Sequence, residues 1–322
     1  MRVVMCEEFG PPTSLKEVDV PRPTPGAGEV LVRVEATGIG FVDGLLIQGK
    51  YQIKPPLPYS AGGEFAGSVE AVGDDATDFK PGDAVFGTSY GSLADFVCAP
   101  ETRCIKAPAG LPLAQAASLW DNYLTAVYGL HTRGQMQSGE TLLVLGAAGG
   151  VGTAAIAVAK AMGARVIGAA STPEKRATAE TAGADATVDY TQDDWRKSLK
   201  AITPEGLNLV YDPVGGDASE AAFRSLAPGG RHLVIGFASG TIAKLPMNLA
   251  LLKRSTLVGV DWGGEATANP AIVSELSGRL IDWIEKGELQ VAAVTERPAS
   301  DFVQAYEDLL AGRIHGKLVL TR

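Results

Sequence analysis

The sequence is poor in the residues that form disulfides and bind transition metals. Its 322 residues include only three cysteines and three histidines. The cysteines form no CxxC pair and no even set, which argues against a disulfide framework and favours a reducing compartment, the cytoplasm. No histidine lies near a cysteine at the spacing of a zinc site, so we expect no bound metal.

The sequence also lacks an excess of positive charge and a long uninterrupted apolar run. Its formal net charge of -9 disfavours a general affinity for nucleic acid or for an anionic membrane surface. The start of the chain, MRVVMCEEFG, has no signal-peptide pattern. The most apolar stretch, 141–170, is interrupted by glycines, Lys160 and Arg165, so we expect no membrane span.

Two patterns divide the chain. The first third has short alternating runs such as EVLVRVEATGIG, separated by Gly/Pro/Asp turns, which predicts a compact, mostly antiparallel β unit. From about residue 118, apolar runs such as TLLVLG, RVIGAA and LNLVYDPV alternate with helical segments, which predicts a parallel sheet with helices on both faces. Two helical stretches and a last strand, GKLVLTR, close the chain. The fold class is therefore α/β.

A glycine-rich turn lies between two apolar runs in the stretch LLVLGAAGGVGTAAIAVAKAMGARVIGAAS. It places free N–H groups and the positive end of a helix dipole at the end of a strand, where a phosphate is favoured. The spacing Ala147-x-Gly149-x-x-Gly152 is the dinucleotide-binding pattern with alanine in place of its first glycine. We assign Ala147, Gly149, Gly150, Val151 and Gly152 to the cofactor site. The alternative is a plain tight turn.

The second strand of this unit ends without the acid that commonly binds the ribose of NAD. It ends in two alanines and Ser171, and the nearby Glu174 has the S-x-x-E spacing of a helix capping box. A 2′-phosphate can therefore sit beside Ser171, Lys175 and Arg176, which favours NADPH. The alternative for the two cations is an exposed helix face.

The chain resembles a known protein family over essentially its full length. It is similar to the zinc-independent quinone oxidoreductases of the medium-chain dehydrogenase/reductase superfamily, which include zeta-crystallin. The matching stretches include VPRPTPGAGEVLVRVEATGIG, GGEFAGSVEAVG, VYDPVGGD, LAPGGRHLVIGFASG and HGKLVL. The resemblance implies a GroES-like, mostly β catalytic domain at 1–120 and 263–322, with a Rossmann-like, doubly wound NADP(H)-binding domain at 121–262.

The resemblance also implies individual site residues. Tyr190 matches a tyrosine placed near the 2′-phosphate, beside Ser171 and Lys175. Residues that match positions lining the nicotinamide end or the cleft are Asp43, Thr125, Val214, Gly236, Phe237 and Lys317. We expect Asp43, Thr125 and Tyr51 on the catalytic side, where Asp43 and Thr125 at most orient substrate or cofactor. Tyr51 either supplies a hydroxyl or packs in a turn.

The zinc-binding members of the superfamily carry a cysteine and a histidine where this chain has Gly40 and Gly63. Zinc stabilises an alkoxide during alcohol oxidation, whereas a quinone or α,β-unsaturated carbonyl is already electrophilic. The resemblance therefore implies metal-free, NADPH-dependent reduction of a quinone or enone.

Several alternatives stay open. Family members commonly carry Asn where Gly40 stands, so a low-turnover, crystallin-like NADPH-binding protein is one alternative. An enoyl- or acryloyl-thioester reductase is another, and it requires a basic patch whose place the sequence does not give. The apolar stretch STLVGVDW predicts an edge strand, and the family pairs this edge in a homodimer.

Overall fold

The computed structural model describes all 322 residues, and they form two compact units. One unit comprises residues 1–121 and 293–322, and the other comprises residues 122–292. The first unit is thus built from both ends of the chain, as expected. The second boundary falls after Ala292 and not after Trp262. The two helices that follow residue 261 therefore belong with the parallel sheet.

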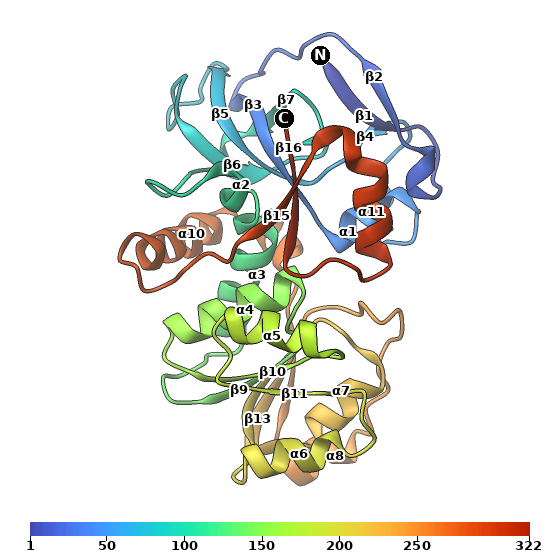
Figure 1. Cartoon of the computed structure of the whole chain (residues 1–322). Helices are drawn as coiled ribbons and strands as arrows, with labels where there is room; N and C mark the ends of the chain where they lie inside the picture. The colour runs from blue at the N-terminus through green and yellow to red at the C-terminus, as the bar shows by residue number, and fades with distance from the viewer. The chain divides into compact units, whose positions relative to one another are not determined.

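The terminal unit is mostly β structure (Figure 1). Its strands are Arg2–Cys6 (β1), Lys16–Asp19 (β2), Glu29–Ile39 (β3), Tyr59–Ser60 (β4), Glu64–Val72 (β5), Ala84–Thr88 (β6), Phe96–Pro100 (β7), Cys104–Lys106 (β8), Val294–Pro298 (β15) and Lys317–Thr321 (β16). Its helices are Phe41–Ile47 (α1), Leu113–Ala116 (α2) and Phe302–Leu310 (α11).

One large sheet of this unit joins the two ends of the chain. Its order is β15-β16-β3-β5-β6-β8, with β7 also paired to β3, and a second sheet has the order β2-β1-β4. Pairing is antiparallel except between β15 and β16. Helices α1 and α11 pack together, where the missing Cβ of Gly44 leaves room for Leu310.

The inserted unit is a parallel sheet covered by helices. Its strands are Thr141–Leu145 (β9), Arg165–Ala169 (β10), Ala186–Val188 (β11), Leu207–Asp212 (β12), Leu226–Val234 (β13) and Thr256–Gly259 (β14). Its helices are Leu124–Val127 (α3), Gly150–Ala161 (α4), Pro173–Thr181 (α5), Trp195–Ile202 (α6), Gly216–Phe223 (α7), Asn248–Lys253 (α8), Trp262–Ala268 (α9) and Pro270–Glu285 (α10).

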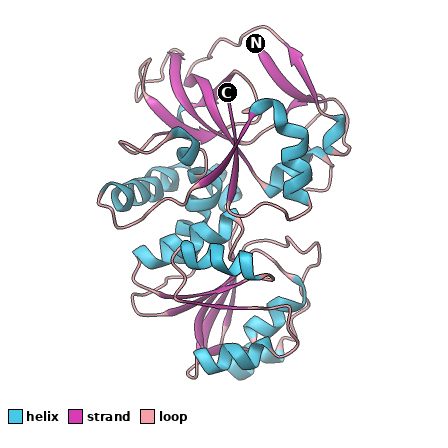
Figure 2. Cartoon of the chain, in the orientation of Figure 1, coloured by secondary structure: helices cyan, strands magenta, loops and turns pink.

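The strand order β11-β10-β9-β12-β13-β14 is that of a doubly wound dinucleotide-binding sheet. All of its pairs are parallel. Helices α4 and α5 lie on one face, and α6, α7 and α8 lie on the other (Figures 1 and 2). Residues 142–145 of β9 are fully buried, as expected for a central strand covered on both faces. The order of the chain reverses between β9 and β12, where ligands of such sheets bind.

No helix is both long enough and apolar enough to cross a lipid bilayer.

Candidate functional site

The glycine turn after β9 is shaped to admit a ligand at the start of α4. Gly146 adopts a φ of 60°, and Gly149 is the N-cap residue of α4. A Cβ on Gly149 would meet nothing closer than the carbonyl oxygen of Gly146, at 3.4 Å. No acid lies in the first turn of α4, so its free N–H groups and positive dipole end are available to an anion. The turn therefore fits a pyrophosphate.

Gly152 has a different role from Gly149. A Cβ on Gly152 would lie 2.3 Å from the carbonyl oxygen of Gly146 and 2.9 Å from Cα of Ala147. The buried Gly152 therefore lets α4 approach the backbone of the preceding turn, as the motif predicts. Gly150 and Val151 lie on the first turn of α4 and are half-buried.

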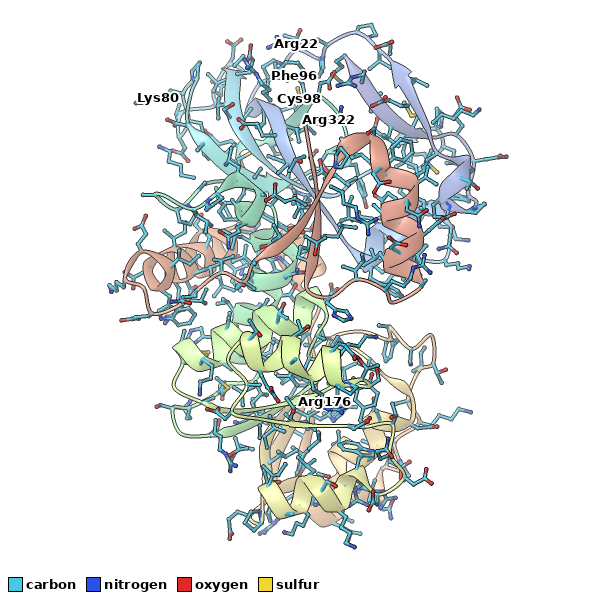
Figure 3. The ribbon with its side chains drawn as sticks, viewed as in Figure 1. Arg22, Lys80, Phe96, Cys98, Arg176 and Arg322 are labelled. Carbon is cyan, nitrogen blue, oxygen red and sulfur yellow. The ribbon has the colours of Figure 1, made fainter.

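The end of β10 presents one free cation. Lys175 lies in the first turn of α5, and its ammonium has no hydrogen-bond or ion-pair partner within the chain. Arg176, labelled in Figure 3, is bound to Asp189 at 3.1 Å and contacts the carbonyl oxygen of Ala170 at 3.4 Å. Of the two predicted cations, Lys175 is therefore the one left for a phosphate.

The expected capping box at α5 is wrong by one residue. Thr172, not Ser171, is the N-cap, and its hydroxyl accepts the N–H of Lys175 at 3.3 Å. Pro173 then occupies the first helical position, which its fixed φ favours. Ser171 is therefore left outside the helix and half-buried, beside the turn that carries Lys175.

The other predicted cofactor residues of this unit lie at the carboxyl ends of neighbouring strands. Tyr190 follows β11 and Val214 follows β12, and both pack against the same buried apolar cluster of the sheet. Val214 also reaches the glycine turn, since a Cβ on Gly146 would lie 2.9 Å from its Cγ2. Gly236 and Phe237 follow β13, and Phe237 is 41% exposed. The structure thus gathers these residues along the edge of the sheet formed by the carboxyl ends of its strands.

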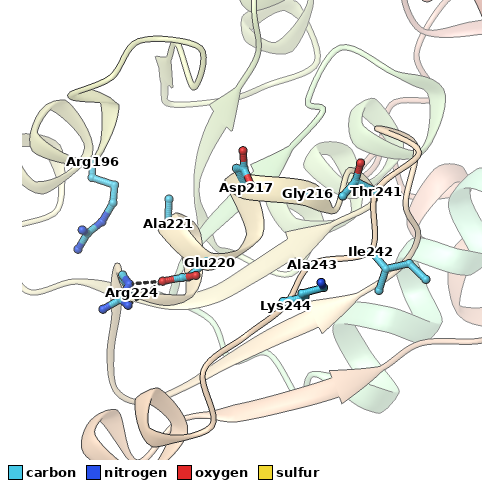
Figure 4. Close-up of a pocket in the computed structure, with 10 residues that line it drawn as sticks. All are labelled: Arg196, Gly216, Asp217, Glu220, Ala221, Arg224, Thr241, Ile242, Ala243 and Lys244. Atoms are coloured by element: carbon cyan, nitrogen blue, oxygen red, sulfur yellow. Dashed lines mark hydrogen bonds and ion pairs between the residues drawn. The ribbon is translucent and has the colours of Figure 1, made fainter.

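A groove of about 470 Å³ begins beside this edge (Figure 4). It is lined by Arg196, Gly216, Asp217, Glu220, Ala221, Arg224, Thr241, Ile242, Ala243 and Lys244. Arg224 pairs with Glu220 at 2.6 Å, while the side chains of Arg196 and Lys244 have no partner within the chain. Arg196, Lys200 and Arg224 lie close enough to Lys253 to add to the lowering of its pKa by burial. Basic side chains therefore meet here, which the sequence did not reveal.

In the terminal unit, four ionisable side chains form a cluster around the position of Gly40. Lys317 forms a buried ion pair with Glu64. The second oxygen of Glu64 accepts the N–H of Asp121 at 3.0 Å. Asp43 accepts the N–H of Gly40 at 2.8 Å. This cluster of Asp43, Glu64, Asp121 and Lys317 holds three carboxyl groups and one ammonium.

Both glycines at the expected zinc-ligand positions face Asp43. A Cβ on Gly40 would lie 3.2 Å from Oδ2 of Asp43 and 3.7 Å from Oδ2 of Asp121. A Cβ on Gly63 would lie 2.9 Å from Oδ1 of Asp43. The missing side chains thus let the backbone at both glycines approach the buried Asp43 carboxyl closely. No group of three or more His, Cys, Asp or Glu side chains is arranged to hold a metal ion.

Charge balance sets the protonation of this cluster. Burial, with a smaller effect from the Asp121 carboxylate, raises the pKa of Asp43 to about 7 against the opposing effects of the Gly40 N–H and Lys317. Burial also raises the pKa values of Glu64 and Asp121, and Lys317 opposes both. Burial lowers the pKa of Lys317, but the surrounding carboxylates outweigh it and the net shift is upward. One ammonium neutralises one carboxylate, so the others favour their protonated form.

Sequence reasoning missed Glu64 and Asp121 and expected Lys317 beside the cofactor. The ammonium of Lys317 is instead bound to Glu64, and a contact with the cofactor stays a prediction. Tyr51 lies in the loop after α1 and is half-buried. Thr125 lies in α3, between the π-helical segments Leu119–Tyr123 and Tyr128–Arg133, a backbone form frequent at functional sites.

The fold and the glycine turn define the class. A GroES-like unit made from both chain ends, with a doubly wound dinucleotide-binding unit inserted, is the architecture of a medium-chain dehydrogenase/reductase. Residues 26–109 match the family described as Alcohol dehydrogenase GroES-like domain, and residues 150–278 match the family described as Zinc-binding dehydrogenase.

Similar proteins narrow the class to one family. The chain is 35% identical to quinone oxidoreductase-like protein 2 homolog of Nematostella vectensis over 99% of its own length and 88% of that protein. It is 33% identical to quinone oxidoreductase of Pseudomonas aeruginosa, with 97% of each chain covered. The solved structure of Escherichia coli quinone oxidoreductase complexed with NADPH superposes with a TM-score of 0.90 at 29% identity and covers 100% of both chains. The chain belongs to the zinc-independent quinone oxidoreductase family.

Proposed function

We propose that the chain is an NADPH-dependent reductase that delivers hydride to a quinone or an α,β-unsaturated carbonyl. The observation that carries this proposal is the glycine turn at α4, with the unpaired Lys175 one strand away and no acid in the place of a ribose-binding carboxylate. The NADPH bound by the Escherichia coli relative supports the same cofactor here.

Different residues of the inserted unit would bind different parts of the cofactor. Gly149, Gly150 and Val151, with the close-packed Ala147 and Gly152 behind them, would hold the pyrophosphate. Ser171, Lys175 and Tyr190 would hold the 2′-phosphate. Val214, Gly236 and Phe237 would bound the nicotinamide. When bound, NADPH supplies the hydride.

The chain's own contribution to the chemistry is positioning and proton supply. Hydride added to a quinone or enone gives a delocalised anion, which needs hydrogen bonds more than a Lewis acid. Asp43 carries a proton near neutral pH because burial raises its pKa to about 7. Its Oδ2 is occupied by the Gly40 N–H, so Oδ1 would hold the proton and could give it to that anion. Solvent is the other proton source, and Tyr51 and Thr125 would orient the substrate.

We also propose that the chain forms a homodimer through the β14 edge. β14 is the last strand of the sheet, as the sequence predicted, and Leu257 on it is 53% exposed. Shortly before β14 in the chain, Met247 is 89% exposed and Leu251 on α8 is 77% exposed. An uncovered strand edge flanked by apolar side chains favours pairing with another copy.

The three free cysteines agree with a cytoplasmic protein.

A thioester substrate is the second candidate function. The groove beside α7 offers the unpaired cations Arg196 and Lys244 to the phosphate of a carrier such as coenzyme A. If this candidate holds, acryloyl-coenzyme A should be reduced faster than a free 2-alkenal, and the double variant R196E/K244E should remove that advantage while sparing the alkenal.

The experiment that tests the proposal uses purified, exhaustively chelated protein. Turnover is measured with 1,4-benzoquinone, 1,2-naphthoquinone, a 2-alkenal, acryloyl-coenzyme A and, in reverse, a simple alcohol. We expect NADPH oxidation with the conjugated acceptors, and deuterium transfer from C4-labelled NADPH into the product of the alkenal. Alcohol oxidation that disappears on chelation would overturn the metal-free mechanism. NADPH binding without turnover of any acceptor would favour the crystallin-like alternative.

A further inference from the structure

One buried carboxylate organises the turn at the end of β12. Asp212, the last residue of that strand, is 2% exposed. Its Oδ1 accepts the N–H groups of Val214 and Gly215, both at 2.9 Å. Its Oδ2 accepts the hydroxyl of Ser219 and lies 2.9 Å from Nε2 of His232. Four polar groups from three elements therefore converge on a single side chain.

The two side-chain partners come from the two elements that follow the turn in the chain. Ser219 lies on α7 and His232 on β13, and both are buried. Nε2 of His232 faces Asp212, while its Nδ1 is buried without a partner. Burial raises the pKa of Asp212, but the bonds from His232, Ser219 and Gly215 outweigh it and the net pKa is lowered. Serine binds the aspartate and not the histidine, so this is not a hydrolytic triad.

The turn held by Asp212 is hydrogen-bonded to a second loop, which follows β13. The carbonyl oxygens of Pro213 and Val214 accept the N–H groups of Ala238 at 3.0 Å and Ser239 at 2.9 Å. The N–H of Gly216 donates to the carbonyl oxygen of Thr241 at 2.9 Å. These three backbone hydrogen bonds join residues 213–216 and 236–241 into one structural body.

This body is tightly packed and contains three predicted nicotinamide-site residues. Gly215 has a φ of 73°, and a Cβ there would lie 2.7 Å from the carbonyl oxygen of Thr241 and 2.9 Å from the ring of Phe237. Val214 projects from one loop toward the glycine turn, while Gly236 and Phe237 lie on the other.

We propose that Asp212 is a positioning residue for the nicotinamide end of the cofactor site, with Ser219 and His232 as its supports. It acts through Val214, Gly236 and Phe237 and touches neither cofactor nor substrate. The inference rests on the proposed function, because it assigns these three residues to the nicotinamide.

The test separates the two ends of the cofactor. Affinity is measured for NADPH and for adenosine 2′,5′-bisphosphate, which has the 2′-phosphate but no nicotinamide. In Asp212→Asn one carboxylate oxygen, which accepts hydrogen bonds, is replaced by an NH2 group, which donates them. We expect NADPH to bind about tenfold more weakly and the rate at saturating NADPH to fall by a similar factor. Adenosine 2′,5′-bisphosphate should keep its affinity within about twofold.

A milder variant and a reference variant keep the test decisive. Ser219→Ala removes one donor and should give the same selective loss at about threefold, which covers the case in which Asp212→Asn does not fold. Lys175→Ala should weaken both ligands, which checks the proposed cofactor site independently. Equal weakening of both ligands by the Asp212 and Ser219 variants, or no weakening of either, would overturn the positioning role. A wild-type protein that binds neither ligand would instead overturn the proposed function.

Discussion

Glu64 and Lys317 form a buried ion pair although 253 positions separate them in the chain. Glu64 begins β5 and Lys317 begins β16, and both strands flank β3 in the same sheet. The pair therefore ties the C-terminal segment to the N-terminal part of its unit and supplies the only ammonium of the four-residue cluster.

Removing that ammonium should destabilise the fold more at high pH than at low pH. Without Lys317, three buried carboxyl groups have no counter-charge, and breaking a buried pair in this way costs about 3–5 kcal/mol. We expect Lys317→Met to lose this much in urea unfolding at pH 8 and clearly less at pH 5, where the carboxyl groups are protonated. Lys286→Met, which breaks an exposed pair with Asp282, should leave stability almost unchanged at both pH values. A loss for Lys317→Met that is independent of pH would contradict this account.

The raised pKa of Asp43 predicts a pH-dependent gain of stability in Asp43→Asn. The folded protein holds the Asp43 proton up to a pH of about 7, while the unfolded chain releases it near its ordinary value, 3.8. Wild-type stability therefore falls as pH rises through this window. The variant lacks this loss, so its advantage should be about 2–3 kcal/mol larger at pH 8 than at pH 5. The exposed Asp193→Asn serves as control, and parallel pH profiles for wild type and Asp43→Asn would show that Asp43 is ionised throughout.

Cofactor preference should depend on Lys175 and not on its neighbour. A charge-assisted bond to a 2′-phosphate is worth about 1.5–3 kcal/mol, so Lys175→Ala should raise the KM for NADPH roughly 10- to 100-fold and barely alter that for NADH. Arg176→Ala is the matched control, because its ion pair with Asp189 leaves no preference between the two cofactors. If Lys175→Ala impairs both cofactors equally, the side chain supports α5 and does not bind the phosphate.

Replacing the two motif glycines by alanine should have different effects, a loss of stability for Gly152 and a loss of NADPH affinity for Gly149. Gly152→Ala forces a Cβ to within 2.3 Å of a backbone oxygen, so we expect it to destabilise the inserted unit. Overpacking of this kind costs about 1–3 kcal/mol or more. Gly149→Ala meets no close neighbour, so it should keep the thermal midpoint but weaken NADPH binding at least tenfold. Circular dichroism melts and NADPH fluorescence titration measure the two effects, and unchanged NADPH affinity in Gly149→Ala would argue against a pyrophosphate at this turn.

Charge placed on the β14 edge should dissociate the proposed dimer. Leu251→Glu combined with Leu257→Glu puts two carboxylates among exposed apolar side chains. Light scattering at micromolar concentration should report a dimer for the wild type and a monomer for this variant. Ile53→Glu, an exposed apolar position in the terminal unit, should leave the mass unchanged. A monomeric wild type would refute the proposal.

The sequence was informative where a function depends on residues close together in the chain. The spacing from Ala147 to Gly152 located the glycine turn, and the alternating strand and helix pattern predicted a parallel sheet with β14 at its edge. The boundary after Ala292 was missed, because the periodicity of α10 shows that it has a buried face but not which unit that face packs in.

Networks formed by distant residues were not predicted. Asp212 and His232 are 20 positions apart, and neither carries a spacing that marks a partner. Asp121 meets Glu64 across 57 positions. Such contacts depend on which strands become neighbours, and the order of strands in a sheet is a property of the tertiary fold.

The position of β16 in the sheet has a consequence for synthesis. This strand lies between β15 and β3, so the last residues of the chain fill an interior place in a sheet begun by its first residues. On the ribosome, residues 122–292 are complete while residues 36–39 of β3 still lack their partner strand. The inserted unit can therefore fold first, whereas the sheet of the terminal unit is completed only when β16 joins it. A chain shortened by its last six residues would lose a central strand and not a loose end.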